Sequence, residues 1–103
     1  MNCGEVWWCD LPEPDRRRPA VIVTRQSAID ILTSVTVAPV TSTIRDVPSH
    51  VPLSIEDGLF GDCVVNCDSL LTIPKESVKR PIARLTAEKL AEVQAAIRFA
   101  LDL

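Results

Sequence analysis

RRRPAVIV at residues 16–23 and VAPVTSTIR at residues 37–45 are the two stretches that decide the fold of this chain. Each joins a continuous apolar run, which is typical of a central strand, to polar side chains at one end of that run. Apolar strands give a rigid base, so the side chains at their ends can face a cleft. We therefore expect the polar ends of these two stretches to form the functional site.

Short runs of strand-forming residues lie on both sides of these stretches. The expected strands cover residues 4–10, 19–24, 33–40, 50–53, 63–67, 70–73 and 82–85. In the first of them, Val6 and Trp8 point to one side and Trp7 and Cys9 to the other. Because both faces are apolar, we expect this strand to be covered on both sides.

Turns and one helix complete the pattern. Two glycines indicate a turn over residues 57–62, and residues 74–77 are typical of a brief helical turn. The clearest helix spans residues 86–101 and begins at Thr86, a favourable N-cap. The apolar side chains at helical spacing on one of its faces are Leu90, Val93, Ile97 and Leu101. The chain is therefore mainly β with a C-terminal helix, and we expect a small, strongly bent sheet or barrel.

Composition and charge limit the classes of protein. At 103 residues, with 47% hydrophobic and 24% charged residues, the chain fits one domain over residues 1–103. It contains no apolar run that could span a bilayer and no signal-like start, so we expect a cytoplasmic protein without membrane contact. A net charge of −3 argues against a general nucleic-acid binder, while the arginines at 16–18 permit a local anion site.

The four cysteines do not indicate a metal centre. Cys3, Cys9, Cys63 and Cys67 lack CxxC spacing, and His50 has no second histidine beside it. In a cytosolic chain we expect reduced, partly buried thiols. The sequence therefore predicts neither a metal nor a cofactor.

Several phrases follow one another in order along nearly the whole chain. They are GEVW at 4–7, RPAVIV at 18–23, APVTST at 38–43, VPL at 51–53, GL at 58–59, VVNCD at 64–68 and LTI at 71–73. This ordered set resembles the MazF/PemK (Kid) family of toxins from bacterial type II toxin–antitoxin systems. The resemblance implies an SH3-like small β-barrel with a C-terminal helix, and a homodimer. It also implies sequence-selective cleavage of single-stranded RNA, and inhibition by a cognate antitoxin that lies across the dimer and the substrate groove.

The resemblance gives Arg18 the place of the family's catalytic arginine and Thr41 that of its active-site threonine. Internal attack by the RNA 2′-OH needs no metal, and intramolecular alignment can supply about 7–11 kcal/mol of the barrier. A guanidinium can grip two phosphate oxygens, and a hydroxyl can donate to one. The residues expected to bind substrate around this pair are Arg16, Arg17, Glu13, Ser42, Thr43 and Arg45.

The group that removes the 2′ proton is left open by the sequence. Arginine is a poor base, and the loop before Arg18 is shorter than in many members of the family. Glu13 or Asp15 could act as the base if this loop folds over the scissile bond. His50 has the usual chemistry for the task, but we expect it at the edge of the strand that follows it rather than in catalysis.

Other interpretations of the same residues exist. A cluster of arginines before a proline is often a solvated strand entry, and the hydroxyls of residues 41–43 could serve a turn. Trp7 and Trp8 could stack on RNA bases, although core or interface positions are more common for such residues. The alternatives to a nuclease are a non-cleaving SH3-like binding module and a gyrase-directed toxin of the same fold.

Overall fold

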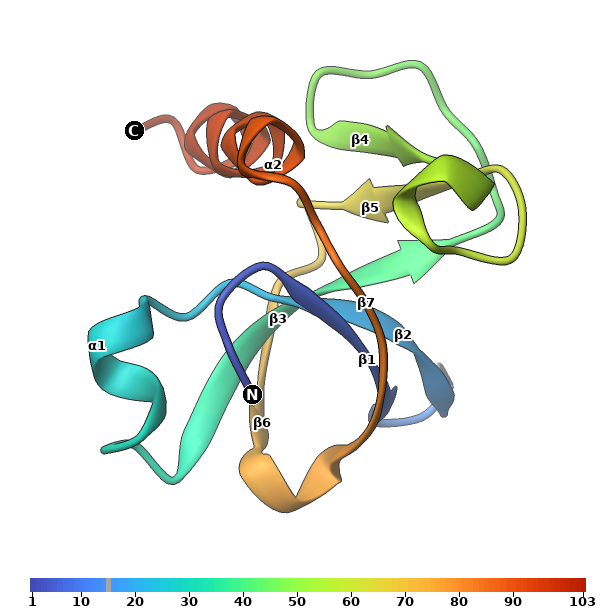
Figure 1. Ribbon diagram of the computed structural model, residues 1–103. Helices are drawn as coiled ribbons and strands as arrows, with labels where there is room; N and C mark the ends of the chain where they lie inside the picture. Colours follow the sequence, from blue (N-terminus) through green and yellow to red (C-terminus); the bar gives the residue numbers. More distant parts are fainter. Residues whose placement is uncertain (15) are drawn as a thin grey trace.

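In the computed structural model, which describes residues 1–14 and 16–103, seven strands form one bent antiparallel sheet (Figure 1). The strands are β1 (Glu5–Asp10), β2 (Arg17–Ile22), β3 (Ser34–Thr41), β4 (His50–Leu53), β5 (Cys63–Asn66), β6 (Leu71–Pro74) and β7 (Val78–Arg84). The helices are α1 (Gln26–Ile29) and α2 (Ala87–Ala100), with short 3₁₀ turns η1 (Ile55–Asp57) and η2 (Lys75–Ser77).

The sheet runs in the order β4-β5-β3-β2-β1-β7, and β6 pairs with another part of β3. The expected mainly β fold with a C-terminal helix is confirmed. The barrel, however, is not closed: β4 and β7 form the two ends of the order in the described part of the chain.

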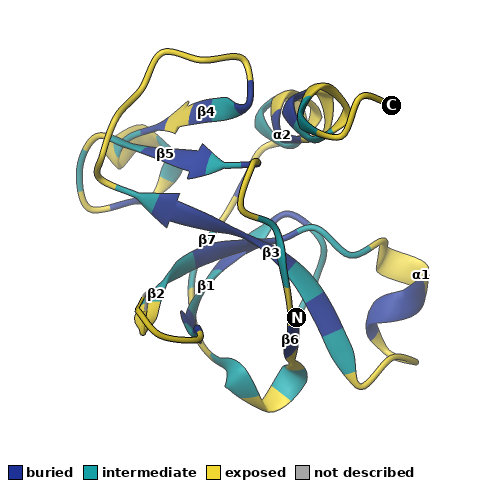
Figure 2. Cartoon of the chain, turned by 180° about the vertical axis from the view of Figure 1, so that it is seen from behind, coloured by how far each residue is buried: buried dark blue, intermediate teal, exposed yellow. Residues whose placement is uncertain are grey.

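Strands β1, β2 and β3 are buried on both faces, which explains their continuous apolar runs. One core is built on alternate residues of these strands, such as Val6 and Val21, together with residues of β4, β5 and α2. The intervening residues, such as Cys9 and Ile22, face a second core with Ile29 of α1 and residues of β6. Figure 2 shows the long dark-blue stretch of β3 running between these two regions. The expectation that β1 is covered on both sides is therefore confirmed.

Strand β3 lies between β2 and β5, and its pairing with β2 ends before its pairing with β5 begins. Residues 37–39 lie opposite residues 20–22 of β2, whereas residues 40–41 lie opposite residues 64–65 of β5. Val23, the residue after β2, donates its N–H to the Thr36 carbonyl of β3, so Pro19, at an alternate position along β2, also faces β3 but has no N–H to donate. The start of β2 and the end of β3 therefore remain close, but they are no longer paired.

Helix α2 begins as expected, because the Thr86 hydroxyl accepts a hydrogen bond from the Lys89 N–H at 3.1 Å. Its buried side chains are Val93 and Ala96, which pack in the first core. Leu101, expected on the same face, is 54% exposed because the helix ends at Ala100 and turns away. No helix in the described residues is long and apolar enough to cross a membrane.

Two other elements differ from the prediction. β7 begins at Val78 rather than at Ile82, and Pro81 lies inside it. This is tolerated because β7 is an edge strand whose register with β1 shifts between Val6 and Trp7. The short helix α1 was not expected; its single turn is held by burial of Ala28 and Ile29 rather than by a side-chain cap.

Gly58 ends the turn η1 and lies against Ala83 of β7. We expect that replacing it with any larger residue destabilises the fold. Its φ is 92°, and a Cβ at this position would lie 2.7 Å from the Cβ of Ala83 on β7. Gly58→Ala should lower the unfolding free energy by about 2 kcal/mol or more, from left-handed strain and overpacking. Gly61→Ala is the matched control, because a Cβ there meets no atom within 4 Å. Equal urea midpoints for the two variants would contradict this account.

The buried thiols predict a loss of stability at alkaline pH. Burial, and secondarily the charge of Asp10, raises the pKa of Cys9 to about 11. Burial, with a smaller effect of Asp68, does the same for Cys67, also to about 11. A raised pKa stabilises the folded chain below the pKa of the unfolded thiol, about 8.5, and this contribution is lost as the pH rises toward 11.

We therefore expect the unfolding free energy, measured in urea, to be steady near pH 7–8 and to fall between pH 9 and 11. The chain contains no tyrosine, so the other side chains that titrate in this range are the lysines and the thiols of Cys3 and Cys63, whose pKa values burial also raises. A double variant, Cys9→Ala with Cys67→Ala, should be less stable at pH 7 but should lose much of this pH dependence. An undiminished fall in that variant would refute the assignment.

Candidate active site

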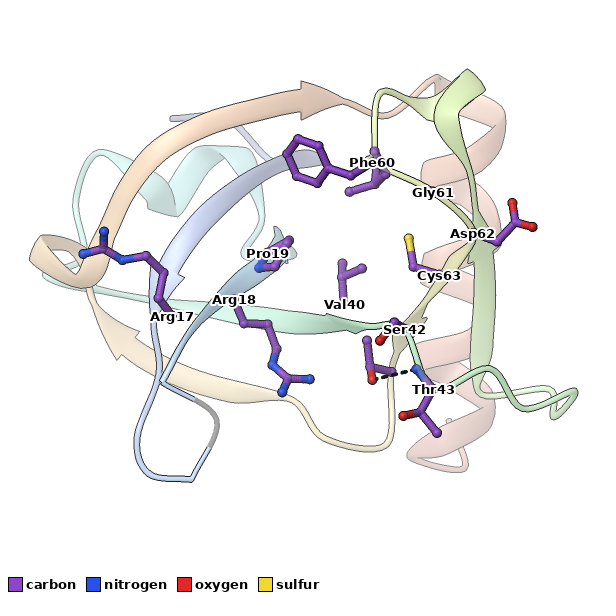
Figure 3. Close-up of a pocket in the computed structure, with 12 residues that line it drawn as sticks. Arg17, Arg18, Pro19, Val40, Ser42, Thr43, Phe60, Gly61, Asp62 and Cys63 are labelled. Carbon is purple, nitrogen blue, oxygen red and sulfur yellow. Dashed lines mark hydrogen bonds between the residues drawn. The ribbon is translucent and has the colours of Figure 1, made fainter.

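A hollow of about 530 Å³ opens where β2 and β3 part. Its walls come from the start of β2, the end of β3 and the segment between η1 and β5, as Figure 3 shows. The residues that line it are Arg17, Arg18, Pro19, Val40, Thr41, Ser42, Thr43, Leu59, Phe60, Gly61, Asp62 and Cys63. The end of the pairing between β2 and β3 therefore leaves the space for a ligand.

A second, smaller hollow of about 270 Å³ adjoins the first. Its lining residues are Arg18, Pro39, Thr41, Thr43, Arg45, His50, Asn66 and Ser69. Arg18, Thr41 and Thr43 line both hollows. We call the place where these three residues meet the junction of the two hollows. Its one guanidinium and two hydroxyls are groups that can bind a phosphate.

The three consecutive arginines have different surroundings. Arg17 donates a hydrogen bond from Nε to Asp10 Oδ1 at 2.8 Å, and this bond is the main reason why the pKa of that carboxyl group is lowered. Arg16 pairs with Glu13 at 3.3 Å. In Figure 3 the Arg18 side chain points toward Ser42 and Thr43, whereas Arg17 points away from them. Arg18 is therefore the arginine best directed at the junction.

Thr41 is half-buried at the last position of β3 and orders the residues that follow it. Its Oγ1 accepts a hydrogen bond from the backbone N–H of Thr43 at 3.1 Å. The hydroxyl hydrogen stays available for an acceptor in the hollow. The same side chain thus shapes the turn and can donate to a ligand, so the turn-forming interpretation and the functional one are compatible.

The opposite wall of the larger hollow is apolar and aromatic. Phe60 is 70% exposed and stacks on Trp8, with ring centroids 5.7 Å apart and an angle of 23° between the planes. The Phe60 ring of this pair lies across the hollow from Arg18 of β2 (Figure 3). A chain with flat bases and an anionic backbone matches this combination of groups.

The structure brings together most, but not all, of the expected site residues. Those that line at least one hollow are Arg17, Arg18, Thr41, Ser42, Thr43 and Arg45. Arg16 and Glu13 line neither hollow; their mutual ion pair at the exposed β1–β2 turn holds them outside. Asp15, considered as a base, lies outside the described residues.

Sequence reasoning missed the side chains that the hairpin of β4 and β5 contributes. They are Phe60, Asp62, Cys63, Asn66 and Ser69. No local signal distinguishes them, because their position depends on how η1 and β5 fold back onto the end of β3. In the described part of the chain, no three His, Cys, Asp or Glu side chains are grouped so as to hold a metal ion.

Comparison with known proteins agrees with this architecture. The family model for PemK-like, MazF-like toxins of type II toxin–antitoxin systems matches residues 2–101. Endoribonuclease MazF3 of Mycobacterium tuberculosis is 40% identical over 93 residues, which cover 90% of each chain. Endoribonuclease MazF9 of the same organism is 37% identical over an alignment of 115 positions, which covers 100% of this chain and 98% of the relative.

Solved structures show the same fold. The Mycobacterium tuberculosis toxin MazF-mt6 superposes with a TM-score of 0.88 at 37% identity, over 96% of this chain and 97% of that chain. An endoribonuclease in complex with its cognate antitoxin, from a mycobacterial species, superposes with a TM-score of 0.89 at 26% identity, over 100% and 96%. The chain belongs to the PemK-like, MazF-like toxins of type II toxin–antitoxin systems, and the expected family is confirmed.

The hydrogen bond from Thr43 to Thr41 gives a test of the local geometry. Thr41→Val keeps the shape of the side chain but removes the acceptor, which should cost about 0.5–1.5 kcal/mol locally. Amide hydrogen exchange at Thr43 should then become about 2- to 10-fold faster. Thr41→Ser keeps the hydroxyl and should retain the protection. Unchanged exchange in Thr41→Val would show that this bond does not order the turn.

Proposed function

We propose that this chain is a toxin endoribonuclease that cleaves single-stranded RNA, messenger RNA or another cellular RNA, in a sequence-selective manner and without a metal ion. Endoribonuclease activity is the activity for which its relatives MazF3 and MazF9 are named. The observation that carries the proposal for this chain is the presence of Arg18 and Thr41 in the wall of both adjoining hollows.

The reaction that fits these groups is internal attack. The 2′-oxygen of a ribose attacks the neighbouring phosphorus, the bond to the 5′-oxygen breaks, and a 2′,3′-cyclic phosphate remains. Because the nucleophile is already tethered to the phosphate, the protein has to align the groups and to stabilise the developing charge. Neither task requires a metal.

Arg18 and Thr41 suit the developing charge. The Arg18 guanidinium is permanently charged and can bind two phosphate oxygens, and the Thr41 hydroxyl can donate to one. Arg17, Arg45, Ser42 and Thr43 surround this pair and supply further donors. Removing one preorganised donor of this kind typically lowers a rate by about 10²–10³-fold.

The larger hollow favours a single-stranded substrate. The stacked Phe60 and Trp8 rings offer a flat apolar face, which suits an unpaired base better than the outside of a duplex. Base selection would then depend on the shape and polarity of the walls around the junction. We expect Arg16 and Glu13, which lie on the β1–β2 turn outside both hollows, to contribute little unless this turn moves on binding.

The remaining parts of the proposal concern the assembly. We propose that residues 1–103 act as one domain, that two copies form a homodimer, and that a cognate antitoxin blocks the RNA site. A relative of known structure was solved with its cognate antitoxin. Large exposed apolar side chains, such as Ile55, Phe99 and Leu103, are available for such contacts. The cytoplasm is the compartment that contains the proposed substrate.

Cleavage of a defined RNA by the purified protein tests the proposal. Activity should persist in EDTA and should leave a 2′,3′-cyclic phosphate. A substrate with a single 2′-deoxy sugar at the cut site should resist, since it lacks the nucleophile. Arg18→Ala should lower the single-turnover rate by about 10²–10³-fold or more. Arg98→Ala, which removes an exposed arginine from α2, is the matched control and should cleave normally.

Three outcomes would contradict the proposal. Equal cleavage of the 2′-deoxy substrate would exclude internal attack. Tight RNA or antitoxin binding without turnover, with Arg18→Ala reducing only the affinity, would indicate a binding module. Inhibition of DNA gyrase in the absence of RNA cleavage would indicate a gyrase-directed toxin.

A further inference from the structure

The proposed reaction needs a group that accepts the 2′ proton, and His50 is placed to do so. It begins β4 and lines the smaller hollow together with Arg18 and Thr41. β4 is an edge strand, as expected, but the His50 side chain is only 8% exposed. Residue 50 is opposite Asn66 of β5, a strand that also pairs with the end of β3. The sheet itself therefore brings this histidine to the junction.

The imidazole of His50 makes unusually few polar contacts for a buried ring. Nδ1 is buried and has no hydrogen-bond partner among the described residues. Nε2 is 3.9 Å from Asp68 Oδ2, which is too long for a hydrogen bond. Buried polar atoms in native proteins nearly always have a partner, so an exception beside a hollow points to a ligand that supplies one.

Asp68 is held in the position from which it can support the ring. Its Oδ2 accepts a hydrogen bond from the Ser49 hydroxyl at 2.5 Å, and Ser49 is itself buried. Its backbone N–H donates to Asn66 Oδ1 at 3.0 Å. A fixed carboxylate near the ring stabilises the imidazolium that forms when the histidine takes up a proton. The Asp68 carboxylate also offsets the repulsion between this imidazolium and the cations Arg18 and Arg45, which line the smaller hollow.

Other proton acceptors are less suitable. Glu13 lines neither hollow and pairs with Arg16. Asp62 lines the larger hollow, but a carboxylate is a weaker base than an imidazole near neutral pH. Burial, with smaller effects of Asp57 and Asp62, raises the pKa of Cys63, so its thiol remains protonated. Of the described side chains that line the site, His50 has the chemistry closest to that of a general base.

We propose that His50 is the general base of the RNA cleavage reaction and that Asp68 is its positioning residue; this inference rests on the function proposed above. The unprotonated ring nitrogen of His50 takes the proton from the 2′-OH. The 2′-oxygen then forms its bond to phosphorus, the bond to the 5′-oxygen breaks, and water gives the departing 5′-oxygen a proton. His50 later returns its proton to solvent. Arg18 and Thr41 hold the phosphate throughout.

The pH profile of single-turnover cleavage by the intact protein tests this role. The wild-type rate should rise as the pH is raised from about 5, because a general base acts only in its unprotonated form. His50→Gln keeps a polar side chain of similar length but cannot act as a base at these pH values. Its rate should fall by about 10²–10⁴-fold and lose that rise. The affinity for a 2′-deoxy oligonucleotide of the same sequence should stay within about threefold, because the phosphate ligands remain.

Asp68→Asn is the second variant, and its side chain is more exposed than that of His50. It should lower the rate less than His50→Gln and leave the affinity for the 2′-deoxy oligonucleotide unchanged, since Asp68 supports the imidazolium and not the phosphate. Asp46→Asn is the matched control: it removes an exposed carboxylate from the neighbouring loop and lines neither hollow. Its rate and pH profile should be those of the wild type.

The outcomes separate this inference from the proposed function. If the wild type cleaves RNA and Arg18→Ala does not, but His50→Gln keeps the wild-type rate and pH profile, the inference alone is wrong. A wild-type profile that is flat from pH 5 to 8 also overturns it, and this result does not depend on any variant folding. If the wild type cleaves no RNA at all, the proposed function itself fails. A His50→Gln protein that loses rate and oligonucleotide affinity together would show a structural role instead.

Discussion

The site depends on the point at which β2 and β3 stop pairing. Until Pro39 this strand is paired with β2, and from Val40 it is paired with β5. An antiparallel ladder can continue only while both strands supply donors and acceptors, and Pro19, which faces β3, supplies no donor. The strands separate there without leaving the sheet. A hollow with rigid walls results, because each wall remains paired on its other side.

The position of the three arginines at the start of β2 also explains how a chain of net charge −3 can carry a cationic site. Asp10 holds Arg17, and Glu13 holds Arg16, so two of the three consecutive arginines are partly compensated by neighbours on the β1–β2 turn. Arg18 stands at the junction of the two hollows with Thr41 and Thr43. A local arrangement of this kind can attract a phosphate even though the protein as a whole repels a polyanion.

The two cores hold β1, β2 and β3, the strands behind the site, in a fixed register. β1, β2 and β3 bury alternate residues on opposite faces, so a shift of one residue would exchange the contents of both cores. Val93 and Ala96 of α2 complete one core, and Ile29 of α1 helps to close the other. The close approach of Gly58 to Ala83 brings the η1 turn against β7 although the sheet does not close into a barrel. The side chains that β2 and β3 contribute to the hollows are therefore carried by strands packed in both cores.

The sequence by itself determined the strands, because continuous apolar runs such as residues 20–23 and the helical spacing around Val93 are local patterns. It also indicated, through the order of its phrases, the family, and it predicted that Arg18 and Thr41 would lie together, as they do in the lining of both hollows. It failed at Pro81, which lies within a strand, since tolerance of proline there depends on β7 being an edge. Only the tertiary structure decided that His50, Asn66 and Phe60 border the same hollows as Arg18. Their contribution arises from pairing between strands distant in sequence, and no local pattern encodes which distant segments meet.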